Sequence, residues 1–363
     1  MFGLFGDLLG GLPKHGDLRA RFENTVTSAA TACGMDARRE RERFLWCWSC
    51  LNYEPRKVCS KDQLGDLSAL TGGQPPTFEL VLRHGASVGF AYLTGGLVCE
   101  TLGQSLAGLL RGALQMLVEQ NTPDQAERLA VLYRLAFPGL HMLSHYSPAA
   151  QAMVLGFVPA GEQTAVKAYF NTRLDTTTPH RERVLRLLGA SGIEDRGTYD
   201  LLYEHCDNVR FHGVGVDLAT GRAKLYIHVA RNLVETTVQR VSEHLGFSAS
   251  SSIDPTTGML SMIESNALID EVEIAIALCG EGPRTLKVTG FFSPKRVSSS
   301  DAERIASYLR MCGHPTAPLD AVIGALCQGV LEPGNQMHPL HAVGLETPVG
   351  DRPKINIYLQ PVT

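Results

Sequence analysis

The sequence predicts an α+β fold in which a ten-stranded antiparallel β-barrel with a polar lumen is surrounded by α-helices. Five segments each contain two alternating or apolar runs joined by a turn, which is the pattern of a β-hairpin. Stretches with helical periodicity lie between these segments. The second strand of several hairpins has one apolar face and one polar, aromatic face, as expected of a sheet with helices outside and a solvated interior.

The elements follow one another along the whole chain. An N-terminal helical region at about residues 14–60 is indicated by the charged stretch DARRERERFLWCWSC. Ser299 or Ser300, ahead of Asp301 and Glu303, is expected to cap the last predicted helix. No composition break suggests a linker, so residues 1–363 are expected to form a single domain. Hairpins are predicted at about 77–93, 150–172, 208–229, 272–292 and 341–362, and helices at 101–120, 123–136, 180–189, 231–246 and 299–313.

A short polar pattern recurs in the second strand of four hairpins. The triplets are Lys167-Ala-Tyr169, Lys224-Leu-Tyr226, Lys287-Val-Thr289 and Asn356-Ile-Tyr358. They recur at intervals of about 60 residues, which suits one hairpin and its helices per structural repeat. An open α+β sheet would satisfy the same pattern. A closed barrel is favoured because it leaves no sheet edges to protect.

Composition limits the classes of function. The chain of 363 residues is 44% hydrophobic and 19% charged, as expected of a globular protein without a nucleic-acid partner, since its net charge is −4. No apolar run reaches the ~18 residues of a membrane span, and the start lacks a basic signal region, so the expected location is the cytoplasm. Phosphate-loop, dinucleotide, H-E-x-x-H and aspartate-rich diphosphate motifs are absent, which removes the usual support for nucleotide or metal chemistry.

One short motif suggests a different chemistry. Residues 85–89, GASVG, match the G-x-S-x-G nucleophile elbow of serine hydrolases, with Ser87 as the nucleophile. That motif requires a strand, a tight turn and then a helix. The following residues, FAYLTGG, are instead expected to form the returning strand of a hairpin.

Cations and tyrosines gather on the presumed inner face of the barrel. A cluster of cations indicates a polyanion, for which phosphate is the natural choice. Tyrosine rings indicate shielding of a cation. The combination predicts an allylic diphosphate that ionises, although an ordinary solvated face would show the same cations. The inner-face residues are Lys167, Arg222, Lys224 and Lys287, with Tyr169, Tyr226 and Tyr358.

A carboxylate is expected on the same face. By alternation along residues 77–83, Glu79 lies opposite the apolar Leu80 and Leu82. A carboxylate in the lumen could accept a proton from a substrate. The alternative is a weak surface ion pair between Glu79 and Arg83.

Taken together, these residues resemble a known family. The segments TFEL around Glu79, VKAYFN at 166–171, GRAKLYIH at 221–228 and KINIYLQP at 354–361 are similar to the aromatic prenyltransferases of the dimethylallyltryptophan synthase type. The resemblance runs from about residue 60 to the C-terminus, and the length is similar to that of the bacterial members. It implies a PT barrel built from αββα repeats.

The resemblance also implies a reaction. In this family a dimethylallyl group passes, through an allylic cation, from dimethylallyl diphosphate to the indole of L-tryptophan or a tryptophan-derived small molecule. No metal or cofactor is implied, because fixed cations can neutralise the leaving group. Tyrosine, phenolic or phenazine acceptors stay open, as does a non-catalytic barrel that binds prenyl diphosphate. Either a monomer or a homodimer is expected.

The resemblance assigns roles residue by residue. Glu79 would hold the indole N–H and act as the base. The sequence departs from the family pattern at three places. Val88-Gly89-Phe90 stand where an arginine is usual, and Lys287 and Thr289 stand where a glutamine and a fourth tyrosine are common. Lys354 is the candidate counterpart of the family's C-terminal arginine. The implied diphosphate-binding residues are Lys167, Arg222 and Lys224, with Lys287 added from its place on the inner face. The implied cation shield is Tyr169, Tyr226 and Tyr358, and the implied acceptor-binding residues are Arg210, Asn171, Leu70 and Thr71.

Overall fold

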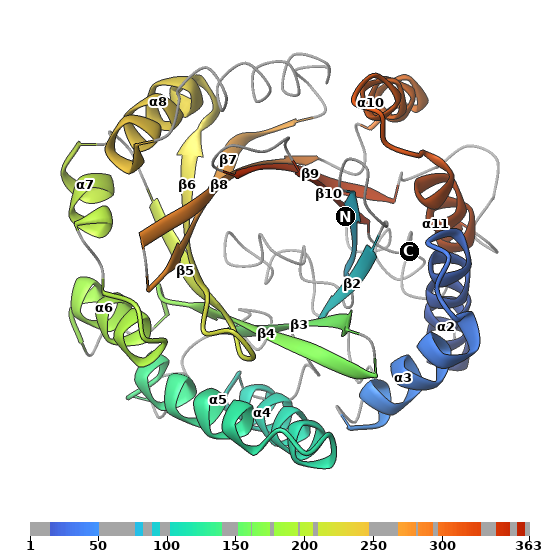
Figure 1. Cartoon of the computed structure of the whole chain (residues 1–363), viewed down its shortest axis with the longest axis horizontal. Helices are drawn as coiled ribbons and strands as arrows, with labels where there is room; N and C mark the ends of the chain where they lie inside the picture. The colour runs from blue at the N-terminus through green and yellow to red at the C-terminus, as the bar shows by residue number, and fades with distance from the viewer. Residues whose placement is uncertain are drawn as a thin grey trace, which may run out of the picture.

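Ten antiparallel strands form a closed barrel in the computed structural model of the chain (Figure 1). The order around the barrel is β1-β10-β9-β8-β7-β6-β5-β4-β3-β2, so the first and last strands pair and close the sheet. The predicted barrel is therefore confirmed over the open sheet. The structure describes residues 15–50, 77–82, 89–94, 102–139, 152–160, 162–174, 178–194, 197–205, 210–246, 268–280, 282–292, 297–327, 339–348 and 354–359.

The strands pair as five hairpins at the positions expected from the sequence. Because consecutive strands are neighbours everywhere except at the closure, the barrel is a simple meander. The strands are β1 (Thr77–Leu82), β2 (Gly89–Thr94), β3 (Met153–Ala160), β4 (Gln163–Asn171), β5 (Arg210–Asp217), β6 (Ala223–Ala230), β7 (Leu268–Cys279), β8 (Gly282–Phe292), β9 (Leu340–Pro348) and β10 (Lys354–Leu359).

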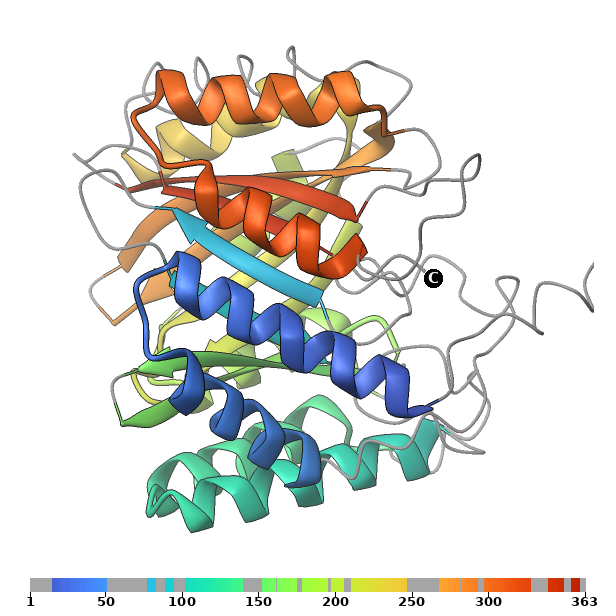
Figure 2. The same cartoon turned by 90° about the vertical axis from the view of Figure 1, so that its right-hand side faces the viewer.

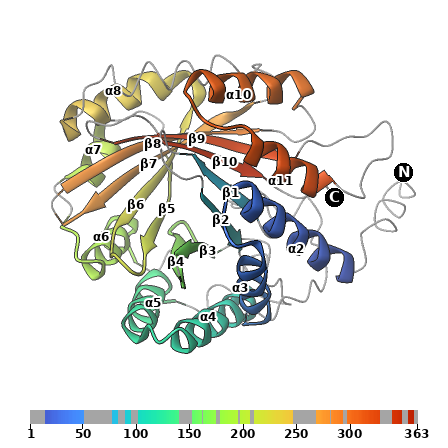
Figure 3. The same ribbon diagram turned by 45° about the vertical axis from the view of Figure 1, so that its right-hand side comes forward.

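The helices form an outer layer around the barrel (Figure 1). Helices from the two ends of the chain, α2 and α11, lie side by side, so the helical layer also joins the N-terminal and C-terminal parts of the chain (Figures 2 and 3). The helices are α2 (His15–Ala32), α3 (Ala37–Cys50), α4 (Leu102–Glu119), α5 (Pro123–Ala136), α6 (His180–Ala190), α7 (Thr198–His205), the 3₁₀ turn η3 (Arg231–Leu233), α8 (Val234–Leu245), α10 (Ser299–Met311) and α11 (Ala317–Cys327).

The main hydrophobic core lies between the barrel and its helices. Leu225 and Ile227 on β6, like Leu80 on β1, are fully buried members of this core. Successive residues of a strand alternate between the two faces. Lys224 and Glu79, which are one position away, therefore face the interior of the barrel. Burial of the outer face fixes the strand register, because a slip of one residue would turn the cations into the core.

Two local expectations are changed or limited by the structure. Helix α10 is capped by Ser298, not by Ser299 or Ser300. Ser298 accepts a hydrogen bond from the backbone N–H of Asp301, whose carboxylate in turn accepts from the N–H of Ser298, and this capping box starts the helix at Ser299. The predicted N-terminal helical region is described only over residues 15–50, and assignment of the whole chain to one domain stays a prediction.

The hydrolase motif has a strand where a helix is required. β2 begins at Gly89, the last residue of the motif, and returns antiparallel to β1. A nucleophile elbow needs a helix at this place. Ser87 itself and Arg83, the alternative partner of Glu79, lie outside the described residues. None of the described helices is long and apolar enough to cross a membrane.

Candidate active site

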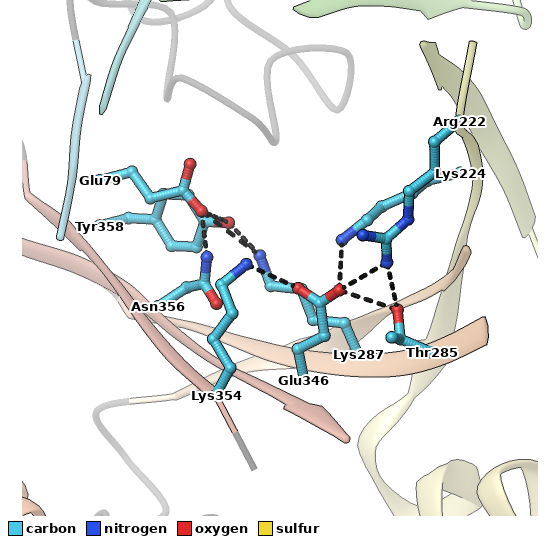
Figure 4. Close-up of polar contacts among 9 residues, drawn as sticks. All are labelled: Glu79, Arg222, Lys224, Thr285, Lys287, Glu346, Lys354, Asn356 and Tyr358. Atoms are coloured by element: carbon cyan, nitrogen blue, oxygen red, sulfur yellow. Dashed lines mark hydrogen bonds and ion pairs between the residues drawn. The ribbon is translucent and has the colours of Figure 1, made fainter. Parts of the chain in front are cut away.

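Two neighbouring polar clusters line one side of the barrel interior (Figure 4). The Glu79 cluster consists of Glu79, Lys287, Asn356 and Tyr358. The Glu346 cluster consists of Glu346, Arg222, Lys224, Thr285 and Lys354. Strands β1, β6, β8, β9 and β10 contribute these residues, with Arg222 immediately before β6. Residues far apart in the sequence therefore meet only because the sheet closes.

In the Glu79 cluster one carboxylate oxygen is held by two donors. The Tyr358 hydroxyl donates to Glu79 Oε1 at 3.0 Å, and the Asn356 amide donates to the same atom. The Lys287 ammonium lies 3.9 Å from Oε1, donates to the Tyr358 hydroxyl and sits 4.6 Å from the centroid of the Tyr358 ring. The other oxygen, Oε2, points away from these partners toward the lumen (Figure 4). That oxygen takes no part in the contacts within the cluster.

The charge of Glu79 is set by its surroundings. Burial by itself would raise the pKa of this carboxyl group, since water no longer solvates the charge. The positive charges of Lys287, Lys167 and Lys354 and the Asn356 hydrogen bond outweigh burial and lower the pKa to about 2. Glu79 is therefore ionised at neutral pH although its residue is only 6% exposed.

In the Glu346 cluster a buried carboxylate is surrounded by cations. Glu346 Oε1 lies 3.0 Å from Arg222 Nη2 and 3.1 Å from Lys224 Nζ. Oε2 lies 3.0 Å from Lys354 Nζ. The Thr285 hydroxyl donates to Oε1 at 2.8 Å and accepts from Arg222 Nη2 at 2.8 Å. Glu346 on β9 thus holds together cations that come from opposite sides of it, β6 and β10.

Small residues on the intervening strand allow these long contacts. β7 lies between β6 and β8 and presents Ala277 opposite Lys224, and Ala275 opposite Lys287. An alanine covers little of the inner surface, so the side chains of Arg222 and Lys224 can reach across β7, and past Thr285 on β8, to Glu346 on β9. Larger residues on β7 would separate the cations from Glu346.

The pKa values of the buried lysines and of Glu346 are all lowered, but for different reasons. Burial lowers the pKa of Lys224 to about 7; Glu346 opposes this, while the cations Lys287, Lys354 and Arg222 add to it. Burial likewise lowers the pKa of Lys287. The pKa of Glu346 is held well below its ordinary value because Lys224, Lys354 and Lys287 outweigh the effect of burial. The site therefore holds more cationic groups than its own carboxylates can neutralise.

The predicted tyrosine shield is packed against glycines. Tyr169 and Tyr226 meet edge to face, with ring centroids 5.9 Å apart. On the strand between them, β5, a Cβ on Gly215 would lie 2.8 Å from Tyr169 Cδ1 and 2.9 Å from Tyr226 Cε2. On β3, a Cβ on Gly156 would lie 3.2 Å from the Tyr169 ring. The rings can approach the backbone of β5, and the Tyr169 ring also that of β3, because these two positions have no side chain.

Replacing Gly215 by alanine is expected to displace both rings. Overpacking of this kind costs ~1–3 kcal/mol, so thermal unfolding should occur at lower temperature and turnover should fall. Gly108→Ala on α4 is the matched control, since no atom lies within 4 Å of its added Cβ, and removing a helical glycine should stabilise the protein by about 0.5–1 kcal/mol. A Gly215→Ala variant with unchanged melting and turnover would contradict this packing.

For the remaining predicted site residues the structure gives mainly their positions on the strands. Lys167 lies on β4 opposite Asp217 and Gly156, on the same inner face as Tyr169. Asn171, at the end of β4, is buried and accepts a hydrogen bond from the backbone N–H of Arg173. Arg210 begins β5 and pairs in register with His228. Leu70 and Thr71 lie outside the described residues.

Sequence reasoning missed Glu346 and Thr285. The alternating pattern of residues 340–346, LHAVGLE, could have found Glu346, because it shares a face with Ala342 and Gly344 and pairs with Lys287 and Lys354. Thr285 gives no comparable signal, since a threonine two residues before a lysine is ordinary in a strand. Lys354, the weak counterpart of a C-terminal arginine, lies in the Glu346 cluster.

A row of buried polar atoms continues beyond the two clusters. By register, Glu273 on β7 lies opposite Thr289 on β8, and Gly344 on β9 lies between Thr289 and Asn356. Within the described part of the chain, Glu273 Oε2, Thr289 Oγ1 and Asn356 Oδ1 have no hydrogen-bond partner. Glu273 Oε2 lies 3.9 Å from His228 Nε2. Buried polar atoms of this kind are available to water or to a ligand.

Comparisons with known proteins identify the fold. No family model matches the sequence, and no curated protein matches it. Solved structures do match. 5-Dimethylallyl tryptophan synthase from Streptomyces coelicolor, in complex with DMASPP and Trp, superposes with a TM-score of 0.72 at 17% identity over 95% of each chain. The chain has the PT-barrel fold.

Two further PT barrels are similar to nearly the same extent. The prenyltransferase PriB, in a ternary complex with L-tryptophan and dimethylallyl thiolodiphosphate, has a TM-score of 0.69 at 16% identity, covering 95% of this chain and 96% of that one. AnaPT from Neosartorya fischeri has a TM-score of 0.67 at 11% identity, covering 99% and 97%. The predicted architecture is therefore that of solved PT barrels along almost its whole length.

The described part of this PT barrel contains no group of three or more His, Cys, Asp or Glu side chains placed to hold a metal ion. The two clusters in its lumen contain Arg222, Lys224, Lys287 and Lys354. Such groups bind phosphate oxygens directly.

Proposed function

We propose that this protein is an aromatic prenyltransferase. It transfers a dimethylallyl group from dimethylallyl diphosphate to the indole of L-tryptophan or of a tryptophan-derived small molecule, without a metal ion or cofactor. The observation that carries the proposal is a set of buried and half-buried cations beside a buried, ionised Glu79 in one lumen. The solved PT barrels that bind tryptophan together with dimethylallyl thiolodiphosphate or DMASPP support it.

The cations would bind the diphosphate and stabilise it as a leaving group. Arg222 and Lys224 already hold an anion, the Glu346 carboxylate, at hydrogen-bonding distance. Lys167 and Lys287 complete the proposed diphosphate site. In a lumen from which water is excluded, such fixed charges replace the metal ions that other enzymes use for diphosphate departure.

The tyrosines would shield the allylic cation. The rings of Tyr169 and Tyr226 contact each other edge to face, and the Tyr358 hydroxyl donates a hydrogen bond to Glu79. Burial raises the pKa of all three phenols well above the ordinary value, so they stay neutral and present their electron-rich faces. Each well-placed ring can stabilise a cation by ~0.5–2 kcal/mol.

The reaction would take place in three steps: ionisation of the diphosphate, attack by the indole and loss of a proton. The bond between the allylic carbon and oxygen breaks, and its electron pair leaves with the diphosphate. The indole then attacks the dimethylallyl cation through carbon or nitrogen, forming one new bond. Glu79 takes up the proton that the ring loses, which restores the aromatic system.

The charges of the site would couple the two substrates. In the free protein, Lys287, Lys167 and Lys354 keep the pKa of Glu79 at about 2, which makes it a weak base. A bound diphosphate would neutralise these cations and raise the pKa of Glu79. The carboxylate thus becomes an effective base once the diphosphate is in place.

The residues proposed to bind the aromatic acceptor are those that the family resemblance implies. Arg210 would bind the α-carboxylate of the acceptor, and Asn171 and the backbone near Leu70 and Thr71 would complete its pocket. The row of unpartnered polar atoms on β7, β8 and β10 offers further contacts to an acceptor. We place the reaction in the cytoplasm, in a monomer or a homodimer.

Arg210→Ala is expected to raise KM for L-tryptophan by more than ten-fold, because a buried or half-buried carboxylate loses its charged partner. With tryptamine, which has no carboxylate, KM should change little. Arg186→Ala on the outer helix α6, where Arg186 pairs with Glu182 at the surface, is the matched control. An unchanged KM for L-tryptophan would show that the acceptor is not held by its carboxylate at Arg210.

The proposal as a whole is tested by following pyrophosphate release from dimethylallyl diphosphate with and without L-tryptophan. Release should depend on the acceptor and persist in EDTA. Loss of all turnover in EDTA would refute metal independence, and release without any acceptor requirement would indicate hydrolysis instead of prenyl transfer.

A further inference from the structure

Glu346 occupies the place where an anionic ligand is expected. Its carboxylate is 3% exposed and contacts Arg222, Lys224 and Lys354 through both oxygens, at 3.0–3.1 Å. These distances lie within the range of N–H···O hydrogen bonds, and a phosphate oxygen would accept from the same groups. A ligand that used the same three cations would have to take the position of this carboxylate (Figure 4).

The arrangement is more than an ordinary surface ion pair. Each of the two oxygens has its own cation, and Thr285 donates a further hydrogen bond to Oε1. Arg222, the most exposed of these cations with 39% of its side chain accessible, is also tied to Thr285. The carboxylate therefore holds the cations in a compact anion site that is already formed before any ligand is bound.

We propose that Glu346 is a resident anion that competes with the diphosphate for Arg222, Lys224 and Lys354, and so determines how tightly the protein holds prenyl diphosphate and inorganic pyrophosphate. This inference rests on the proposed function, because it assigns a role within the same diphosphate site. Glu346 acts through the cations and does not itself react.

In a transferase, competition between Glu346 and the diphosphate would affect both the charge of the free site and the release of pyrophosphate. Burial, together with the neighbouring cations, lowers the pKa of Lys224 to about 7 even though Glu346 opposes this shift. Without Glu346 the lysine would lose its proton more readily still, so the carboxylate keeps the cations together and holds more of their charge in the free protein. When the diphosphate arrives, with more negative charge than one carboxylate, it displaces Glu346 from them. After transfer, the carboxylate returns and helps the pyrophosphate to leave.

The test is the affinity for inorganic pyrophosphate, measured by isothermal titration calorimetry at pH 6.5. Glu346→Gln keeps the shape and the hydrogen-bonding oxygen but removes the charge. It should bind pyrophosphate at least about ten-fold more tightly than the wild type and show a lower KM for dimethylallyl diphosphate, without a rise in kcat. Glu346→Asp keeps the charge in the site and should bind pyrophosphate more weakly than Glu346→Gln does. Glu182→Gln, an exposed carboxylate on α6, is the control.

The outcomes separate this inference from the proposed function. Unchanged or weaker binding by Glu346→Gln, with wild-type prenyl transfer intact, would overturn the competition and leave the function standing. Absence of pyrophosphate binding in the wild type would overturn both. If Glu346→Gln does not fold, Thr285→Val answers the same question, since it loosens the carboxylate without changing the charge. It should also bind pyrophosphate more tightly, and equal or weaker binding would contradict the proposal.

Discussion

Glu79→Gln is expected to lower kcat for prenyl transfer by about 10²- to 10⁴-fold, the usual contribution of a general base. Glutamine can still accept the hydrogen bonds from Asn356 and Tyr358 but cannot take up the ring proton. The negative charge beside Lys287 also disappears, so pyrophosphate should bind as tightly as to the wild type or more tightly. Steady-state kinetics and calorimetry on the same preparation measure the two effects.

The fold of this variant needs its own check, because Glu79 is the carboxylate nearest to the buried Lys287. Circular dichroism and thermal melting should show a folded barrel, and Glu182→Gln should behave as the wild type in every assay. A folded Glu79→Gln variant with full turnover would mean that the proton goes elsewhere.

Lys224→Met is expected to lower kcat/KM for dimethylallyl diphosphate by about 10²- to 10³-fold, as happens when one preorganised donor to a developing charge is removed. Lys224 is 19% exposed and lies next to Glu346 in the centre of the cations. Methionine keeps most of the volume and the apolar stem. The loss should therefore appear in diphosphate binding and departure, with little change in KM for the aromatic acceptor.

Lys224 is also expected to make the affinity for diphosphate depend on pH. Because the pKa of Lys224 is about 7 in the free protein, this side chain is charged below pH 7 and increasingly neutral above it. Diphosphate binding favours the charged form, so affinity should fall as pH rises from 7 to 9. Lys224→Arg stays charged over that range and should show a smaller fall. Ionisation of the diphosphate itself affects both proteins equally. Identical pH profiles for the two proteins would contradict the lowered pKa of Lys224.

The barrel could be predicted because the alternating patterns that indicate its strands lie within short segments of the sequence. Alternation along residues 221–230 separates Leu225 and Ile227, which pack under the helices, from Lys224 and Tyr226, which face the lumen. The same alternation along β1 puts Glu79 on the face opposite Leu80 and Leu82. Recurrence of the K-x-Y register then showed that several strands share one interior, and closure followed from the cost of exposed sheet edges.

The arrangement inside the lumen could not be predicted in the same way. That Lys287 points to Glu79 and Tyr358, while Lys224 reaches Glu346 across Ala277, depends on the register of strands that are distant in sequence. Glu346 itself was missed because a single acid in a short strand is common at surfaces. Gly215 and Gly156 carry no side chain, so their role in seating Tyr169 is visible only in three dimensions.

The most direct measurement is mass spectrometry of the products after the purified protein is incubated with dimethylallyl diphosphate, L-tryptophan and EDTA. The proposed function predicts a tryptophan product heavier by one C5H8 unit, absent when Glu79→Gln replaces the wild type. No such product, while a known dimethylallyltryptophan synthase forms it in the same buffer, would contradict transfer to tryptophan. If pyrophosphate binding were also absent, the assignment of the cations in the lumen to a diphosphate site would be wrong.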